Sequence, residues 1–413
     1  MRIRTDPVFP MDLTWIFTLV AFLAVACHAL YDCPRPKCET CLPADIYDAP
    51  GVGFDLTPSY GTSAVHYNNG TVVEVVQIHG KSEYLQLMTR LAKQGKPVLM
   101  EDQGILQKSY FKIFSFLDSF FGFPFSARVG WRWLNEKLGR LVGSDDINII
   151  SEMLWDLKLA TEKRTRQDLN RVAITTPDIP TLGHEMINTA LQELDLQAWT
   201  GDCPWYPRRL VEADAVYAAY GYGLCKNYHD LWECTDEFEW AGFPVILFVS
   251  FTRHLLYTSI TIPINGEALH FLAYDEIKDL NFELGLDRIL EADDPDLLWA
   301  RFREQITTFS QSSEFRITGF LLAGESTTNP LFQANLKDAL AELSELNIEP
   351  KIAPFALESV HGEKSMDLTF AAARGAALYA RRRQEVQCDC SEIKECELSR
   401  QKERSGGQEK LDL

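Results

Sequence analysis

Apolar and polar residues alternate over short runs between residues 52 and 76, near the start of the chain. The first run ends in an acid, Asp55, and a polar turn, Thr57–Ser59, follows it. The next two runs flank Asn68-Asn69-Gly70, and Asn-Gly is a strong hairpin signal. The pattern therefore predicts three consecutive strands, with the second and third forming a hairpin. The predicted strands are Val52–Phe54, Ser63–Tyr67 and Val72–Val76.

An acid at a strand end beside a hydroxyl-rich turn has two interpretations. The turn can donate N–H and hydroxyl hydrogen bonds to a phosphate, while Asp55 orients a hydrated cation. Alternatively, the segment is an edge hairpin and Asp55 is exposed to solvent. On this segment alone the exposed hairpin is the favoured interpretation.

Helical and strand periodicities continue along the rest of the chain. Helices are predicted over Glu83–Gln94, Ile147–Arg166, His184–Leu194, Leu210–Leu224, Leu297–Phe309, Asn329–Leu346 and Thr369–Gln384. Strands are predicted over Arg171–Pro177, two apolar runs within Phe243–Ile262, and Ile317–Ala323. From Val386 onward the chain is polar and charged, and we expect it to be disordered apart from its cysteines.

A cluster of phenylalanines lies within Val98–Trp133. Aromatic clusters usually pack in a protein core, so packing in the core or between two lobes of the molecule is the favoured interpretation. A patch that faces a membrane or a partner protein is the alternative. The cluster consists of Phe111, Phe114, Phe116, Phe120, Phe121, Phe123 and Phe125.

The length of 413 residues is sufficient for two to three domains or one large two-lobed domain. The net charge of −19 argues against a nucleic-acid partner, which would require a basic surface. Arg2 and Arg4 precede an apolar run, Leu13–Ala26, and small residues follow it. This pattern is typical of a secretory signal over residues 1–29, either a cleaved peptide or an anchor through residues 12–29. We expect a secreted, lumenal or membrane-anchored protein.

The ten cysteines include three after the signal and three near the C-terminus. The spacing Cys38-x-x-Cys41 is compatible with zinc, but no second such pair and no paired histidines accompany it. Disulfides are the favoured interpretation in an oxidising compartment. Asn69-Gly70-Thr71 is an N-glycosylation sequon, and its place in a hairpin turn would expose Asn69.

Five motifs occur in a recognisable order. They are Asp55 with its turn and hairpin, the strand ending at Pro177 with the helix Val211–Gly221, the strand–turn–strand Phe248–Leu255, the loop Gly324–Thr327 after a buried strand, and the helix Asp367–Ala377. In this order the chain resembles the nucleotide-binding domain of the seventy-kilodalton heat-shock chaperones, in the actin-like ATPase superfamily. The resemblance covers about Gly51 to Gln384.

The resemblance implies an α/β, two-lobed actin-like ATPase (ribonuclease H-like) fold. About seventy residues separate the second turn from Gly324, so the upper subdomain of lobe II is expected to be reduced. Small residues in the two alanine-rich helices would let them cross closely at the hinge. The implied divisions are a signal at 1–29, a Cys/Pro-rich linker at 30–50, lobe I at 51–210, lobe II at 211–366, a closing helix returning to lobe I at 367–386, and a polar tail at 387–413.

The resemblance also implies roles for individual residues. Asp55 and Glu212 would be catalytic, and Asp55 would hold a metal ion through water. The cofactors, if any, would be ATP and Mg²⁺. The nucleotide-binding positions would be Thr57, Ser59, Tyr60, Gly324, Glu325, Ser326 and Thr327. Because the first strand and last helix share a lobe in this family, disulfides between the Cys33–Cys41 and Cys388–Cys396 groups are expected.

Several motif positions depart from the family pattern. Pro58 stands in the first turn and has no N–H to donate. The second turn lacks the family's acid and glycines, and Phe251 and Arg253 are expected to crowd a phosphate, although Arg253 could bind an anion itself. Glu325 replaces a glycine in the adenosine loop.

We therefore expect a degenerate chaperone-type ATPase domain that acts through an unknown protein partner and binds nucleotide weakly or not at all. The alternatives are an active Mg-ATPase with an altered second loop, and a secreted structural module without a ligand.

Overall fold

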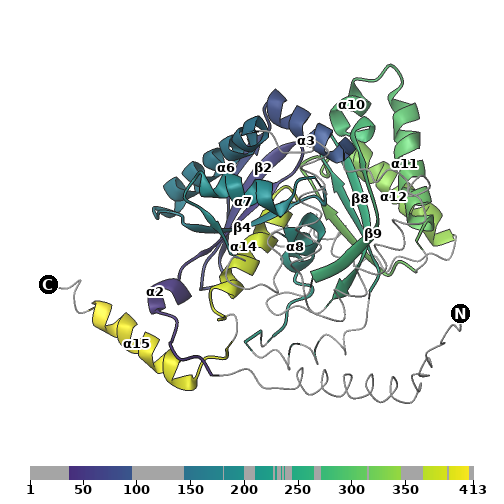
Figure 1. Ribbon diagram of the computed structural model, residues 1–413. Helices are drawn as coiled ribbons and strands as arrows, with labels where there is room; N and C mark the ends of the chain where they lie inside the picture. Colours follow the sequence, from purple (N-terminus) through teal and green to yellow (C-terminus); the bar gives the residue numbers. More distant parts are fainter. Residues whose placement is uncertain are drawn as a thin grey trace, which may run out of the picture. The chain divides into compact units, whose positions relative to one another are not determined.

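A computed structural model of the chain contains two compact units (Figure 1). One consists of Leu42–Val386, and the other joins the segment ending at Cys41 to the segment beginning at Gln387. The structure describes residues 37–94, 144–179, 181–199, 210–226, 228–229, 234, 237, 244–264, 271–313, 316–345, 366–387 and 390–408. The expected signal and the phenylalanine cluster lie outside these residues.

The larger unit is an α/β structure with two mixed sheets, which confirms the predicted class. The first sheet has the strand order β3-β2-β1-β4-β5, and β6 also pairs with β4. β1 is antiparallel to β2 and parallel to β4. The predicted hairpin about Asn68-Asn69-Gly70 is confirmed, and Asn69 is exposed. The strands are β1 (Gly51–Leu56), β2 (Tyr60–His66), β3 (Val72–His79), β4 (Arg171–Thr176), β5 (Gln197–Ala198) and β6 (Leu210–Val211).

The second sheet repeats the arrangement of the first four strands. Its order is β10-β7-β8-β9, with β7 antiparallel to β8 and parallel to β10. β9 was not predicted, because its charged stretch Asp275–Asp279 hides the alternation of a strand. The strands are β7 (Ile246–Phe251), β8 (Leu256–Ile264), β9 (Phe271–Asn281) and β10 (Gly319–Ala323).

Helices and sheets of this unit enclose three cores. The first packs the first sheet against α3, α6 and α7, and the second packs the other sheet against α11 and α12. The third contains α8 and α14 together with residues of both sheets. The helices are α2 (Ala44–Tyr47), α3 (Ser82–Gln94), α6 (Ser144–Thr165), α7 (His184–Gln192), α8 (Glu212–Ala219), the 3₁₀ turn η2 (Phe282–Leu284), α10 (Leu286–Leu290), α11 (Pro295–Gln311), α12 (Pro330–Glu345) and α14 (Ala371–Arg383).

The alanine-rich helices α8 and α14 pack against each other, and α14 also packs on β1. A Cβ at Gly375 would lie 1.7 Å from the carbonyl oxygen of Ala215, so only glycine permits this approach. Gly53 has the same role on β1, where a Cβ would lie 2.2 Å from the backbone nitrogen of Ala377. The predicted close crossing of the two small-residue helices is confirmed.

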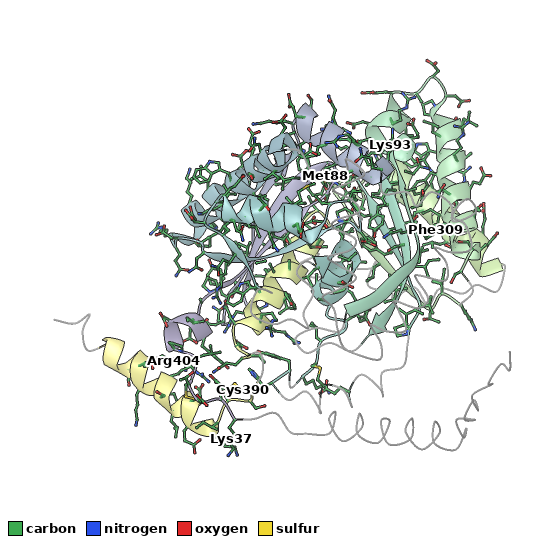
Figure 2. The ribbon with its side chains drawn as sticks, in the orientation of Figure 1. Lys37, Met88, Lys93, Phe309, Cys390 and Arg404 are labelled. Atoms are coloured by element: carbon green, nitrogen blue, oxygen red, sulfur yellow. A yellow bond between two sulfur atoms is a disulfide. The ribbon has the colours of Figure 1, made fainter. Side chains whose placement is uncertain are left out.

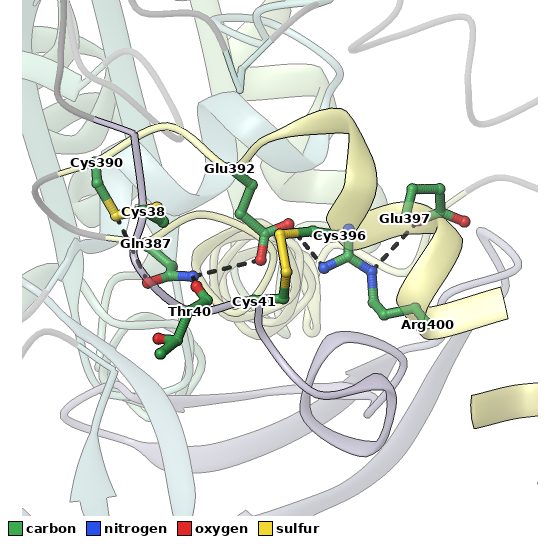
Figure 3. The surroundings of a disulfide bond; sticks show 9 residues. All are labelled: Cys38, Thr40, Cys41, Gln387, Cys390, Glu392, Cys396, Glu397 and Arg400. Atoms are coloured by element: carbon green, nitrogen blue, oxygen red, sulfur yellow. Dashed lines mark hydrogen bonds and ion pairs between the residues drawn. A yellow bond between two sulfur atoms is a disulfide. The ribbon is translucent and has the colours of Figure 1, made fainter. Parts of the chain in front are cut away.

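Two disulfides join the ends of the chain in the smaller unit (Figure 3). Cys38 bonds to Cys390 and Cys41 to Cys396, while the N–H of Cys38 donates to the carbonyl of Ser391 at 3.0 Å. This confirms the expected pairing between the two cysteine groups. The zinc interpretation of Cys38-x-x-Cys41 is wrong, because both sulfurs are in disulfides.

The C-terminal segment forms a helix, α15 (Lys394–Gln408). The expectation of disorder is therefore wrong for these residues. Arg400 is buried and donates to Glu392 Oε2 at 2.7 Å and to Glu397 Oε2 at 3.3 Å (Figure 3). These local ion pairs and the long-range Cys41–Cys396 disulfide stabilise a helix that is otherwise polar.

A third disulfide, Cys225–Cys234, lies in the larger unit. Disulfides persist in oxidising compartments, so these bonds indicate a location in the secretory pathway. Among the described residues, no helix is long and apolar enough to cross a membrane.

Proteolysis without reduction is expected to release three disulfide-linked peptide pairs, joining Cys38 to Cys390, Cys41 to Cys396, and Cys225 to Cys234. Mass spectrometry before and after reduction identifies the pairs. A bond between Cys38 and Cys41 would contradict the arrangement of the smaller unit.

Candidate functional site

Two buried acids lie at the centre of the candidate site. Asp55 is the penultimate residue of β1 and is 1% exposed, and Glu212 begins α8 and is 2% exposed. Val52, Phe54 and Leu56 of β1 enter the first core, so strand alternation turns Asp55 to the other face. The interpretation of Asp55 as a solvent-exposed residue is therefore wrong.

The environment of both acids favours their protonated forms. Burial raises the pKa of Asp55 well above its ordinary value, and the charge of Glu212 raises it further. Burial raises the pKa of Glu212 to about 7, although a hydrogen bond from Ser250 opposes this rise. Ser250 Oγ donates to Glu212 Oε1 at 2.7 Å, whereas Asp55 Oδ1 has no hydrogen-bond partner in the described part of the chain. Both raised pKa values act in the same direction, toward protonated acids.

The turn between β1 and β2 and the turn between β7 and β8 have the same hydrogen-bond pattern, and we call them the first and second turns. In the first turn, Thr57 N donates to the carbonyl of Tyr60 at 2.9 Å, and Tyr60 N donates to Thr57 Oγ1 at 3.0 Å. In the second turn, Thr252 N donates to the carbonyl of Leu255 at 2.9 Å, and Leu255 N donates to Thr252 Oγ1 at 3.1 Å. Each threonine hydroxyl closes its own turn.

This correspondence places Ser250 where the first sheet has Asp55. Phe251 takes the place of Leu56, and its ring stacks on Phe332 at a centroid distance of 4.4 Å within the second core. The expectation that Phe251 crowds the turn is therefore wrong, because strand alternation sends its side chain inward. Arg253 is exposed, and its Nη2 lies 2.9 Å from Asp287 Oδ2.

A hydrogen bond joins the two turns directly. Ser59 Oγ donates to Thr252 Oγ1 at 2.8 Å, and both residues are buried. Tyr84 also donates its hydroxyl hydrogen to the Thr57 carbonyl at 2.8 Å, which anchors the first turn to α3. The hydroxyls that the sequence offered for phosphate binding are thus used within the protein.

The loop Gly324–Thr327 packs against the second turn. Gly324 has φ +109°, and a Cβ there would lie 2.3 Å from the Phe251 carbonyl oxygen, so both conformation and space require glycine. Ser326 N donates to the same oxygen at 3.1 Å, and Thr327 Oγ1 donates to the Gly324 carbonyl at 2.7 Å. The structure therefore places this predicted loop beside the second turn.

Glu325 links elements of both sheets. Its Oε2 accepts a hydrogen bond from Gln77 Nε2 of β3 at 2.6 Å, and its Oε1 accepts from Arg253 N at 3.3 Å. The side chain of Glu325 is 9% exposed. A backbone N–H of the second turn thus donates to a carboxylate of the chain itself.

Asp55 could serve as a ligand to a cation, whereas the two turns are poorly suited to a phosphate. Carboxylate oxygens are suitable ligands for Mg²⁺, and Asp55 Oδ1 is available for one. No group of three or more His, Cys, Asp or Glu side chains that could hold a metal ion occurs in the part of the chain that the structure describes. A triphosphate does not fit, because Pro58 has no N–H, the second turn has no glycine, and Ser59 is bonded to Thr252.

Sequence reasoning missed the parts played by Ser250, Thr252 and Gln77. A comparison of Asp55-Leu56-Thr57-x-x-Tyr60 with Ser250-Phe251-Thr252-x-x-Leu255 would have indicated the repeated turn. No such local signal exists for Gln77, which is distant from Glu325 in sequence.

Comparisons with known protein families and with curated protein sequences give no match for this chain.

Proposed function

We propose that the chain is a degenerate, chaperone-type ATPase domain of the actin-like superfamily, located in the secretory pathway. It acts mainly through contacts with other proteins and binds nucleotide weakly or not at all. The observation that carries this proposal is the buried Ser59–Thr252 hydrogen bond, which joins the two turns where the family holds phosphates.

The chemistry of phosphoryl transfer supports this proposal. Transfer depends on a positioned cation, backbone donors to the phosphates and an oriented water. Here Ser250 stands at the position where the family has an acid, and the N–H of Arg253 donates to Glu325. Asp55 and Glu212 have raised pKa values, which disfavours the charged forms that hold a cation.

The architecture agrees with a two-lobed actin-like fold in which lobe I spans 51–210, lobe II spans 211–366 and a closing helix spans 367–386. The repeated strand order of the two sheets and the close crossing of α8 and α14 are the features that support it. The scaffold would then persist as a rigid platform for a partner, which distinguishes this proposal from a structural module without ligands.

A specific observation favours the alternative of an active Mg-ATPase. Asp55 Oδ1 is buried without a hydrogen-bond partner among the described residues, and it lies within electrostatic range of Glu212. A divalent cation would satisfy this oxygen and restore both acids to their charged forms. In that case Asp55 and Glu212 would have the roles that the family resemblance implies.

Thermal unfolding with and without Mg-ATP tests the proposal. We expect no resolvable change in Tm, because the two turns are bonded to each other and do not hold phosphates. A ligand that did bind, at a hundred times its Kd, would stabilise the protein by about 2.7 kcal/mol and raise Tm by several degrees. Asp55→Ala is the control, since it removes the only expected cation ligand. A saturable rise in Tm that Asp55→Ala abolishes, accompanied by ATP hydrolysis, would establish the alternative.

A further inference from the structure

An open groove of about 690 Å³, whose lining includes neither Asp55 nor Glu212, lies between α3 and the tips of the two turns. Its volume is within the range of pockets that bind small ligands or short peptide segments. Apolar lining comes from Pro58, Leu85 and Phe282. This apolar surface lies beside charged side chains.

Every charged residue that lines this groove is basic. The chain as a whole has a net charge of −19, so a groove lined by basic residues differs from the overall composition. The basic side chains belong to Arg90 and Lys93 of α3, Arg253 and His254 of the second turn, and Arg288 of α10. Lys93 lies near the C-terminal end of α3 (Figure 2).

The arginines keep donors available to a ligand. Arg90 pairs with Asp146, Arg253 with Asp287 and Arg288 with Glu283, but none of these acids lines the groove. Each guanidinium has five N–H donors, and one acid uses only part of them. The arginine side chains are between 46% and 62% exposed.

Lys93 strengthens the basic character of the groove. It is exposed, and no ion pair is formed by it with any residue that the structure describes. Ion pairs of the exposed arginines are weak and exchange readily with other carboxylates. An incoming anion therefore meets Lys93, which forms no ion pair with a described residue, and three arginines with spare donors.

We propose that this basic groove binds a short acidic segment of a partner protein. An apolar side chain of the segment lies against Leu85 and Phe282, and flanking carboxylates pair with Lys93 and Arg288. Guanidinium groups match carboxylates in a two-point geometry, which provides specificity. The proposal rests on the proposed function, since it names the kind of partner through which the domain acts.

The apolar lining favours a peptide over an inorganic polyanion. Leu85 and Phe282 are only partly buried, so an apolar side chain of a peptide can bury more of their surface, whereas a phosphate or sulfate cannot. The test therefore has to separate these two kinds of anion.

Fluorescence polarisation with the full chain and a labelled Glu-Asp-Leu-Asp-Glu peptide tests the proposal. We expect saturable binding that weakens as salt rises, because the contacts are exposed charges. Lys93→Glu and Arg288→Glu are each expected to weaken binding roughly fivefold, and a peptide with Ser in place of Leu is expected to bind several-fold more weakly. Lys337→Glu, which reverses a charge at an exposed position of α12, is the matched control and is expected to leave binding unchanged.

Three results would overturn the proposal. The first is no saturable binding up to about 1 mM peptide, and the second is equal weakening by Lys337→Glu. The third is tighter binding of tripolyphosphate than of the peptide, together with a peptide affinity that the Leu-to-Ser change leaves unaltered. Thermal unfolding confirms that each variant is folded, and Lys93→Gln and Arg288→Gln replace any that is not. Mg-ATP stabilisation is measured separately, so a failure of the groove and a failure of the proposed function are distinguishable.

Discussion

Glu212→Gln is expected to raise the free energy of unfolding at pH 8 by about 3 kcal/mol and to change it little near pH 4. The glutamine has the same shape as glutamate and can still accept the hydrogen bond that Ser250 Oγ donates to Oε1. It cannot acquire a negative charge beside Asp55. The effect therefore isolates the energetic cost of an ionised acid at this buried position.

The direction follows from the raised pKa. Burial takes the pKa of Glu212 from its ordinary 4.5 to about 7, so the folded state binds this proton more tightly than the unfolded state. The stability that the bound proton contributes is fully present below pH 4.5 and is lost as the pH rises through 7. The raised pKa of Asp55 acts in the same direction.

Urea unfolding of both proteins across this pH range measures the difference. Glu342→Gln, on the exposed face of α12, is the control and is expected to have no pH-dependent effect of this size. A Glu212→Gln variant whose stability difference is the same at pH 4 and pH 8 would show that Glu212 is ionised in the folded protein. The same experiment with Mg²⁺ reports whether a cation restores the charged form.

Gly375→Ala is expected to cost at least about 3 kcal/mol of stability, or to prevent folding. Alanine normally stabilises a helix interior by about 1 kcal/mol relative to glycine. Here its Cβ would lie 1.7 Å from the Ala215 carbonyl oxygen, which belongs to backbone and cannot rotate away. The crossing of α8 and α14 would have to widen, and the core between the sheets would lose its packing.

Gly183→Ala is the matched control for this substitution. A Cβ at Gly183 meets no atom within 4 Å, and its φ of −72° suits alanine. We expect a change of less than about 1 kcal/mol, because Gly183 precedes α7 as an N-cap without a side-chain bond. Denaturant unfolding of both variants makes the comparison, and a stabilised Gly375→Ala would mean that the helices cross less closely than the structure shows.

Much of the fold was predictable because its signals are local. Strand alternation and Asn-Gly located the first hairpin, and apolar periodicity located α3, α6 and β4. The end of the chain was harder to predict, since α15 is held by a disulfide to Cys41, which is far away in the sequence. Composition alone indicated disorder there.

The chemistry of the turns can be read directly from the amino-acid sequence. Pro58, Ser250 and Glu325 can be seen in it directly, as can the small residues of α8 and α14 and the two cysteine groups. A pattern along one strand shows which residues share a face, and the loss of glycines from a turn is visible in the same way.

How these groups are used depends on the folded arrangement. It buried Asp55 beside Glu212, bonded Ser59 to Thr252 and brought Gln77 to Glu325, and it gathered five basic side chains around one groove. These arrangements join residues that are far apart in the chain. Burial, pKa and hydrogen bonding depend on what packs against a residue, and a local pattern carries no information about partners from distant segments.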